Sequence, residues 1–282
     1  MKIKQIVVIV MVCAITGYLY LLPPKGLVKP KPTRTNGGVA GDRPAAANVN
    51  VATVSAAAKI AIGDALSGKI NDLESQLKNA PESNKPALEK QLALQWDDDN
   101  QPAPAAFYYL AIAQTENKFE NWLDAGNRFN DSYKLTQDSS SKAVYTADAA
   151  EAFQSALKLQ PKSLDAKMGL GIADVNGAAS PMTGIGLLLE VVKEDPKNRS
   201  ANLNLGLFAM KSGQYEKAVD RFKTIIANDP KPELEPYFYL AETYKQLGRK
   251  AEAIAAYQKC KELMPDPVFG KRIDDYIKEL KN

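Results

Sequence analysis

The side chains that could carry chemistry in this chain are few and poorly spaced. Its 282 residues contain no histidine, which removes Ser-His-Asp and Cys-His arrangements, the usual zinc sites and the commonest general base. The densest acidic run is Asp97 to Asn100. Counted as a calcium loop, it has Pro102 where a glycine must turn the chain and Tyr108 where the bidentate glutamate belongs. We therefore expect no catalytic residue and no metal site, and we interpret the acidic run as a solvated loop that ends a helix.

Two glycine pairs and two cysteines complete the candidates for chemistry. Gly169-Leu-Gly171 and Gly184-Ile-Gly186 lack the third glycine or the Gly-Lys-Ser/Thr that a phosphate loop needs. Cys13 lies in the uncharged apolar run at 6–22 and Cys260 on a predicted repeat helix, so no disulfide within the chain is expected. We expect no cofactor, and we expect that the chain is not an enzyme.

The glycines belong to a pattern that recurs along the chain. Its prolines lie 34 residues apart from Pro196 to Pro230 and 35 apart from Pro230 to Pro265. The clearest copy reads Asn202-x2-Leu205-Gly206-x2-Ala209, then Gly213, Tyr215, Ala218-x3-Phe222 and Pro230. The next copy reads Tyr237-x2-Leu240-Ala241-x2-Tyr244, then Gly248, Ala253-x3-Tyr257 and Pro265. An earlier copy has Leu170-Gly171, Gly184-x3-Leu188 and Pro196, and the first has Trp122-x2-Ala125-Gly126-x2-Phe129, Ala149-x3-Phe153 and Pro161.

This pattern resembles the tetratricopeptide repeat (TPR) family, whose template is W-x2-L-G-x2-Y…A-x3-F…P in about 34 residues. The resemblance covers roughly residues 119–265 and is closest to the bacterial, membrane-anchored type. It implies an all-α fold, a right-handed superhelical solenoid of antiparallel helix pairs. The repeats are predicted at 119–161, 164–196, 199–230 and 234–265.

The first copy departs from the template by an insertion. The step from Trp122 to Ala149 is about 11 residues longer than the step from Asn202 to Ala218. The added segment carries Gln-Asp-Ser-Ser-Ser at 137–141, whose side chains compete for backbone hydrogen bonds. We interpret it as a solvated loop.

Further helices are expected on both sides of the repeats. Residues 266–282 have apolar side chains at helical spacing and are predicted to form a capping helix. Residues 54–118 are predicted to hold N-terminal helices, either a divergent repeat or a coiled-coil segment. Within them 54–77 carries one continuous apolar stripe, which packs as a hairpin on a helix at 86–96 or as a short coiled coil on a second chain. Gly63 and Gly68 weaken either arrangement.

The start of the chain has the composition of a membrane signal. After a short tail at 1–5, residues 6–22 are uncharged and apolar, and we interpret them as a transmembrane anchor, with a cleaved signal peptide as the main alternative. Residues 23–53 are predicted to be a flexible Pro/Lys/Ala-rich linker. Lysines flank both sides of the apolar run and do not settle its orientation. The short tail resembles a bacterial signal anchor in the inner (plasma) membrane, which would place the repeats on the periplasmic or extracytoplasmic side.

The charge distribution argues against nucleic-acid binding. Residues 1–43 hold seven basic side chains against Asp42 alone, whereas the formal charge of the whole chain is +3. The rest of the chain is therefore mildly acidic and attracts phosphate backbones little.

The TPR resemblance implies that the first helix of each repeat lines a concave groove that binds a protein or peptide segment. Asn204 falls where family members use an asparagine to hold a ligand's main chain, and only Lys245 is placed for a carboxylate clamp, so that clamp is not expected. The predicted groove residues are Leu123, Asn127, Asn130, Met168, Ile172, Val175, Leu203, Asn204, Leu207, Met210, Phe238, Glu242 and Lys245.

Two functions follow from these features. The first is a membrane-tethered scaffold or adaptor that mediates protein–protein interaction through this groove. The second is a structural subunit of an oligomeric cell-envelope assembly, a homo-oligomer that associates through a helix at 54–77. The sequence does not identify the partner.

Overall fold

The computed structural model describes residues 49–177, 181–231 and 233–281. Its regular elements in these ranges are all helices. Among the helices so described, none has the length and apolar character needed to cross a membrane. The predicted tail at 1–5, the anchor at 6–22 and linker residues 23–48 lie outside the described ranges. The end of the predicted linker is helical, because Asn50 caps a helix by accepting hydrogen bonds from the N–H groups of Ala52 and Thr53.

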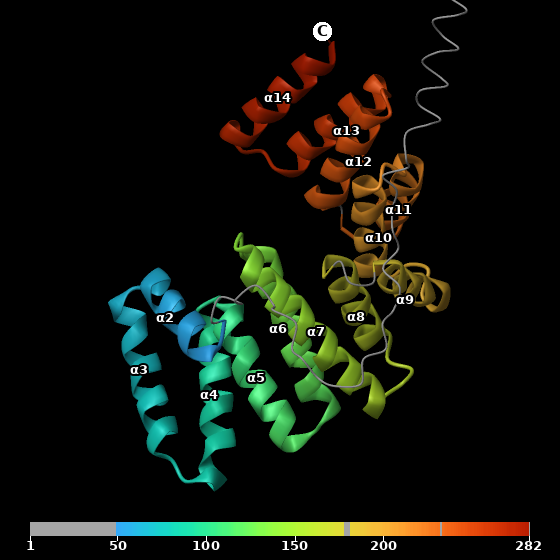
Figure 1. Cartoon of the computed structure of the whole chain (residues 1–282). Coiled ribbons are helices and arrows are strands. Elements are labelled where there is room, and N and C mark those ends of the chain that lie inside the picture. The colour runs from blue at the N-terminus through green and yellow to red at the C-terminus, as the bar shows by residue number, and fades with distance from the viewer. Residues whose placement is uncertain (1–48, 178–180, 232, 282) are drawn as a thin grey trace, which may run out of the picture. The chain divides into compact units, whose positions relative to one another are not determined.

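The N-terminal part of the described chain consists of four helices and a short 3-10 turn. These are α2 (Val51–Ile62), α3 (Asp64–Asn79), η1 (Glu82–Asn84), α4 (Lys85–Asp98) and α5 (Pro102–Glu116). Helix α3 packs against α4, and α2 packs against both α3 and α5 (Figure 1). The part of the predicted stripe that lies in α3 therefore packs against the helix predicted at 86–96, which is α4.

The expectation of one continuous stripe over 54–77 was wrong. Gly63 has φ +79°, a left-handed conformation that ends α2 and starts α3 in a new direction. Ala58 on α2 and Ile70 and Leu73 on α3 are all buried in the same core of this chain. Most of the apolar stripe is therefore buried by packing within the chain.

The acidic run at 97–100 is only partly solvated. Asp97 lies in the last turn of α4, where it accepts two hydrogen bonds from Arg128, Nε to Oδ1 at 2.6 Å and Nη2 to Oδ2 at 3.0 Å. The hydroxyl of Tyr109 donates a third, at 2.9 Å. Asp97 therefore ties α4 to α5 and α6, which corrects its interpretation as a solvated loop residue.

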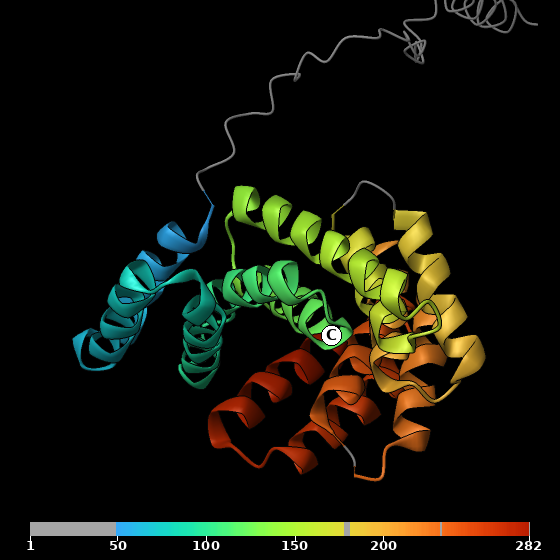
Figure 2. The same ribbon diagram turned by 90° about the horizontal axis from the view of Figure 1, so that it is seen from below.

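Four helix pairs follow along the chain. They are α6 (Phe119–Leu135) with α7 (Ser139–Leu159), α8 (Leu164–Asn176) with α9 (Pro181–Glu194), α10 (Arg199–Lys211) with α11 (Tyr215–Asn228), and α12 (Leu234–Gln246) with α13 (Lys250–Leu263). Each helix packs against the next (Figures 1 and 2). The small residues of the pattern allow this closeness: a Cβ on Gly206 would stand 2.6 Å from the ring of Phe222, which is fully buried.

The insertion in the first pair forms helix instead of the predicted loop. Asp138 caps α7, because its carboxylate accepts a 2.6 Å hydrogen bond from the N–H of Ser141. The serines at 139–141 form the first turn of that helix. Helices α6 and α7 have 17 and 21 residues, against 13 and 14 in α10 and α11. The Asp-Ser-Ser-Ser run is a helix start, since these side chains favour N-terminal capping as well as loops.

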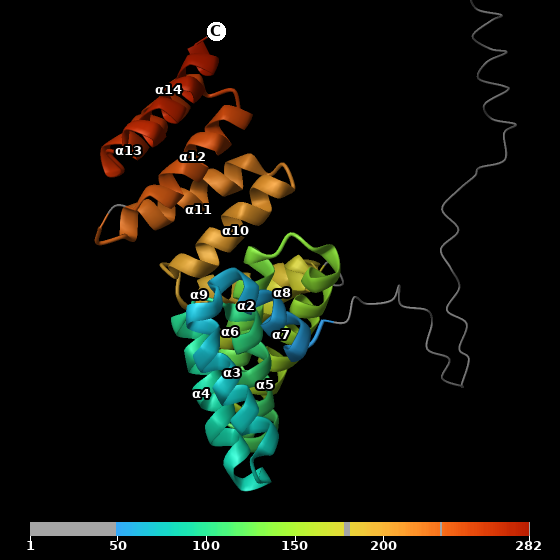
Figure 3. The ribbon, with the colours of Figure 1, turned by 90° about the vertical axis from the view of Figure 1, so that its left-hand side faces the viewer.

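The last helix, α14 (Pro267–Lys281), packs against α13 (Figure 3). It buries Ile273, Ile277 and Leu280 and exposes charged residues on its other side.

The buried apolar residues form three clusters. The N-terminal cluster extends from Ala58 to Ala173, and the C-terminal cluster from Ala209 to Leu280. Between them a small central cluster joins α8, α9 and α10 through Ile172, Leu188, Val191, Ala201 and Leu205.

Candidate functional site

The middle of the predicted groove is an apolar stripe on α10. Leu203, Leu207 and Met210 are half-buried and lie at positions i, i+4 and i+7, on one face of the helix. They pack against the C-terminal cluster and keep part of their surface free. Asn204 is half-buried beside them, and its Nδ2 donates a 2.8 Å hydrogen bond to the carbonyl of Ser200 in its own helix.

A second asparagine on α10, Asn202, lies two residues before Asn204 and is buried. Its side chain is fully buried and its Nδ2 donates to the carbonyls of Pro196, at 3.0 Å, and Asn198, at 2.9 Å. Its Oδ1 accepts a 3.1 Å hydrogen bond from Arg221 of α11. Asn202 therefore holds the turn before α10 to α11, in the position where the repeat template has tryptophan.

At the C-terminal end, the predicted groove residues of α12 contact the helices that follow. The ring of Phe238 lies 6.1 Å from that of Tyr257 and 6.4 Å from that of Tyr276 on α14. Glu242 accepts a hydrogen bond from the hydroxyl of Tyr257, and burial together with this carboxylate raises the pKa of Tyr257. Lys245 lies over the Tyr276 ring at 5.7 Å and near Glu279 at 3.5 Å. Glu242 and Lys245 thus have partners within the chain.

Beside these contacts lies an aromatic cavity of about 550 Å³. Its aromatic lining comes from Phe238 and Tyr239 on α12 and from Phe269 and Tyr276 on α14. The remaining lining residues are Glu233, Leu234, Glu235 and Arg272. Glu233 and Glu235 are also held by Arg199 of α10. The cavity offers apolar ring surface next to both signs of charge, which suits an apolar or aromatic side chain within a polar peptide.

At the N-terminal end, two of the predicted residues are not available to a partner. Ile172 is buried in the central cluster. Asn130 is also buried and donates a 3.0 Å hydrogen bond from Nδ2 to the carbonyl of Gly169 on α8. Their placement in the groove was wrong, because α8 covers Asn130 and α9 and α10 cover Ile172. The others keep accessible surface: Leu123, Met168 and Val175 are half-buried and Asn127 is exposed. Val175, however, lines a cavity with residues of α9, α10 and α11.

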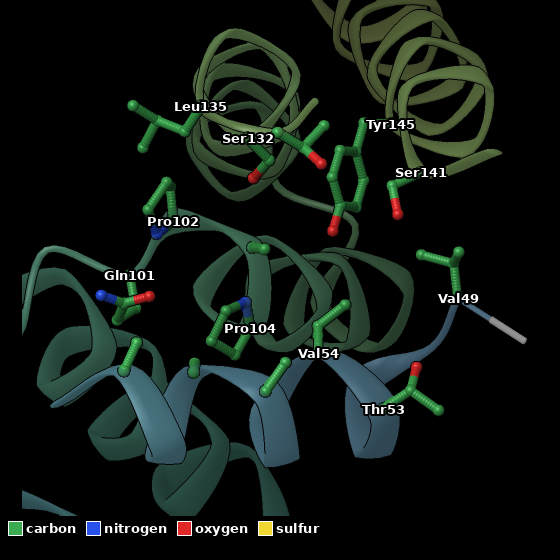
Figure 4. Close-up of a pocket in the computed structure, with 15 residues that line it drawn as sticks. Val49, Thr53, Val54, Gln101, Pro102, Pro104, Ser132, Leu135, Ser141 and Tyr145 are labelled. Atoms are coloured by element: carbon green, nitrogen blue, oxygen red, sulfur yellow. The ribbon is translucent and has the colours of Figure 1, made fainter. Parts of the chain in front are cut away.

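A second cavity, of about 530 Å³, was not anticipated from the sequence. It lies between α2, the start of α5, the end of α6 and the start of α7, and Figure 4 shows Val54, Pro104, Leu135 and Tyr145 around it. The lining is uncharged and mainly apolar, with Ala57 and Ala61 supplied by α2. The side chain of Leu135 is 65% exposed. The run of alanines in α2 was a sequence signal for it.

A third cavity, of about 540 Å³, lies between α9, α10 and α11. Of its lining, only Val175 was among the predicted groove residues, because the TPR resemblance directs attention to the opposite side of α10. Met182 and Leu189 on α9, both exposed and at helical spacing, were a signal for it.

Candidate metal ligands and the cysteine thiol were located among the described residues. No cluster of three or more Cys, Asp or Glu side chains able to hold a metal is present among those residues. Cys260 is buried, and burial raises the pKa of its thiol to about 11, so the reactive thiolate is scarce at neutral pH.

Comparisons with known proteins agree with the repeat pattern. The tetratricopeptide repeat family matches residues 181–233 and 234–267. These matches overlap the predicted repeats at 164–196, 199–230 and 234–265, while the first predicted repeat lies outside them. No curated protein matches the chain.

Solved structures resemble the fold. A thermophilic TPR protein from Thermus thermophilus is 19% identical, with 67% of this chain and 97% of that chain covered and a TM-score of 0.52. MamA of Desulfovibrio magneticus is 20% identical, with 64% and 95% covered and a TM-score of 0.50. The helix pairs described above and these matches together show that the chain contains tetratricopeptide repeats between residues 181 and 267. Its fold is TPR-like and all-α.

Proposed function

We propose that this protein is a scaffold that binds a segment of a partner protein along the first-helix face of its repeats, and that residues 6–22 hold it at a membrane. The observation that carries the binding role is the aromatic cavity formed by Phe238, Tyr239, Phe269 and Tyr276. TPR repeats build interaction surfaces by stacking helix pairs. No enzymatic role is proposed.

The aromatic cavity has the properties of an anchoring pocket. Aromatic side chains present a large rigid surface, so little conformational entropy is lost when a partner side chain packs on them. Leu203, Leu207 and Met210 on α10 pack on the same cluster as Phe238, and we propose that they extend the binding surface along α10. A partner segment anchored in the cavity would continue along this stripe toward Met168 on α8.

Site-specific photo-crosslinking in living cells tests this proposal. A photoreactive residue in place of exposed Arg272, at the cavity, should capture a discrete partner that mass spectrometry identifies. The same residue in place of Ala255, exposed on α13, is the control and should capture no such partner. Equal capture at both positions would refute binding in the cavity.

A peptide from the captured partner then allows a quantitative test. Phe269 is half-buried and lines the cavity, so Phe269→Ala should weaken the peptide's affinity by roughly tenfold or more. The circular dichroism spectrum should remain that of an all-helical protein.

The membrane tether rests on the uncharged run at 6–22, which follows Lys2 and Lys4. We propose an inner-membrane anchor with the repeats on the extracytoplasmic side. Alkaline phosphatase fused after residue 282 is active only outside the cytoplasm, so an active fusion in the carbonate-resistant membrane fraction is expected. An inactive fusion would indicate that the repeats lie on the cytoplasmic side. Release of the fusion from the membrane by carbonate would contradict the anchor.

The second candidate is a structural subunit that self-associates through 54–77. The observation in its favour is that Ile60 and Leu66 remain exposed in α2 and α3. Against it, Ala58, Ile70 and Leu73 are buried within the chain. Sedimentation of the full chain in detergent decides between the two, because a subunit of this kind must oligomerise and Ile60→Asp with Leu66→Asp must dissociate it.

A further inference from the structure

The face of α10 opposite to its groove stripe lines a cavity of its own. A helix turns about 100° per residue, so Leu205, Phe208 and Ser212 lie on the side away from Leu203 and Met210. Leu205, Phe208 and Ser212 line the cavity between α9, α10 and α11. On α10 this cavity therefore lies on a different face from the stripe in the proposed function, although the predicted groove residue Val175 of α8 also lines it. Occupation of the aromatic cavity does not require occupation of this one.

The apolar part of the cavity comes mainly from α9. Met182, Ile185 and Leu189 line it at intervals of three and four residues, which places them in one row along the helix. The side chains of Met182 and Leu189 are 77% and 45% exposed. Large apolar side chains left exposed in a row beside a cavity are a usual sign of a binding surface.

The polar part comes from α10 and α11 and is basic. Lys211, Lys217 and Arg221 line the cavity together with a single carboxylate, Asp220. Lys217 donates to Gln214 at 2.6 Å and Arg221 to Asn202 at 3.1 Å. Within the described ranges, the ion pairs of the chain include none of these three cations. Their charges remain available to a carboxylate brought by a partner.

We propose that the cavity between α9, α10 and α11 binds an acidic, amphipathic segment of a partner protein. The segment's apolar side chains would pack against Met182, Ile185 and Leu189, and its carboxylates would pair with Lys211, Lys217 and Arg221. The concave form of the site favours a peptide over an anionic bilayer, because a volume of about 540 Å³ accepts protruding side chains whereas a lipid surface is broad and flat.

The test uses the full chain in detergent and a phage-displayed library of random short peptides. Enriched peptides should combine Leu, Met or Phe with Asp or Glu, and they are then synthesised with a fluorescent label for anisotropy titration. Lys211→Glu with Lys217→Glu should weaken binding by roughly tenfold or more, and added salt should weaken binding to the native protein, because the contacts are electrostatic. Met182→Ser should weaken binding without changing the salt dependence, since it removes only apolar contact.

A matched charge reversal controls for the change in net charge. Lys158 and Lys162 are exposed and line none of the cavities described above, so Lys158→Glu with Lys162→Glu should leave the affinity unchanged. Thermal unfolding of each variant checks that it folds.

Three results would overturn the proposal. They are the absence of enriched peptides, enrichment of basic or uncharged peptides, and equal affinity of the native protein and the Lys211/Lys217 variant. Stronger binding to vesicles of anionic phospholipid than to any enriched peptide would assign the surface to a membrane instead. None of these results affects the crosslinking test at Arg272, so failure here and failure of the proposed function are distinguishable.

Discussion

Gly184 of α9 lies directly against Gly171 of α8: a Cβ on Gly184 would stand only 2.5 Å from the carbonyl oxygen of Gly171. The obstacle is backbone, which cannot rotate away as a side chain can. The repeat template has alanine at this position, and Ala218 and Ala253 occupy it in the next two repeats. The pair α8–α9 is therefore packed more closely than the template requires.

Gly184→Ala should destabilise the protein although it restores the template residue. The substitution gains about 1 kcal/mol of helix propensity, but forcing a methyl group against the carbonyl costs more, and we expect a net loss of about 2 kcal/mol. Urea unfolding followed by circular dichroism measures it. Gly186→Ala, where an added Cβ meets nothing within 4 Å, is the control and should be stabilising by up to about 1 kcal/mol. Equal effects of the two substitutions would contradict the close approach.

Asp97→Asn should loosen the junction of α4, α5 and α6. The substitution weakens two hydrogen bonds from Arg128 and one from Tyr109. Because Asp97 is partly exposed, we expect a modest loss of about 1 kcal/mol in the free energy of unfolding. Asp98→Asn, at an exposed neighbour, is the comparison and should change the denaturation midpoint little. An unchanged midpoint in Asp97→Asn would show that the network contributes nothing.

Asp148 should make stability depend on pH in the mildly acidic range. Burial, with a smaller contribution from Glu151, raises the pKa of Asp148 from 3.8 to about 6. The folded state therefore holds this proton more tightly than the unfolded chain, and its contribution to stability, fully present below pH 3.8, is lost as the pH rises to about 6. Asp148→Asn should remove this loss and stabilise the protein at pH 7 by about 1 kcal/mol after allowance for screening by solvent.

Chemical denaturation of the native protein and Asp148→Asn at several pH values checks the sign. The difference between the two should be small at pH 4 and largest at pH 7. A difference that is constant with pH, or that grows on acidification, would contradict the raised pKa.

Substitutions at Asn202 and Asn204 should have different effects, the first on the stability of the fold and the second on peptide binding. Asn202→Ala removes the side-chain donor to the carbonyl of Pro196 and frees Arg221, while the carbonyl of Asn198 keeps the backbone N–H of residue 202. We therefore expect a loss of about 2 kcal/mol in the free energy of unfolding. Asn204 bonds only to its own helix through Nδ2, and Asn204→Ala should leave the thermal midpoint within about one degree. If Asn204 holds the main chain of a ligand, the same substitution should weaken the peptide identified by crosslinking, and an unchanged affinity would exclude that role.

The repeat helices could be predicted from the sequence because each pattern residue has one local role. Gly206 with Phe222 and the proline at 230 specify two packed helices and the end of the second. Such information lies within one repeat and does not depend on the rest of the molecule. The N-terminal helices lack it, and the stripe at 54–77 could not reveal that the φ value of Gly63 would divide it.

The groove was predicted less completely than the helices because accessibility depends on neighbours. Asn130 and Ile172 have the right helical phase, but residues of the next pair bury them. Phe238, Glu242 and Lys245 also have the right phase, yet α14 reaches Phe238 and Lys245 through Tyr276. The cavity between α9, α10 and α11 was missed because periodicity shows which residues share a face but not where two helices stand apart.

The division of the core into three clusters has a mechanical consequence. Helix α9 contributes its fully buried side chains, Leu188 and Val191, only to the small central cluster, whereas the flanking clusters are each much larger. Because these clusters follow one another along the chain, we expect a load applied between its two ends to disrupt the smallest cluster first. We expect the separation to begin where α9 meets α10, because α8 and α9 are held closely together at Gly171 and Gly184 and α8 also belongs to the N-terminal cluster.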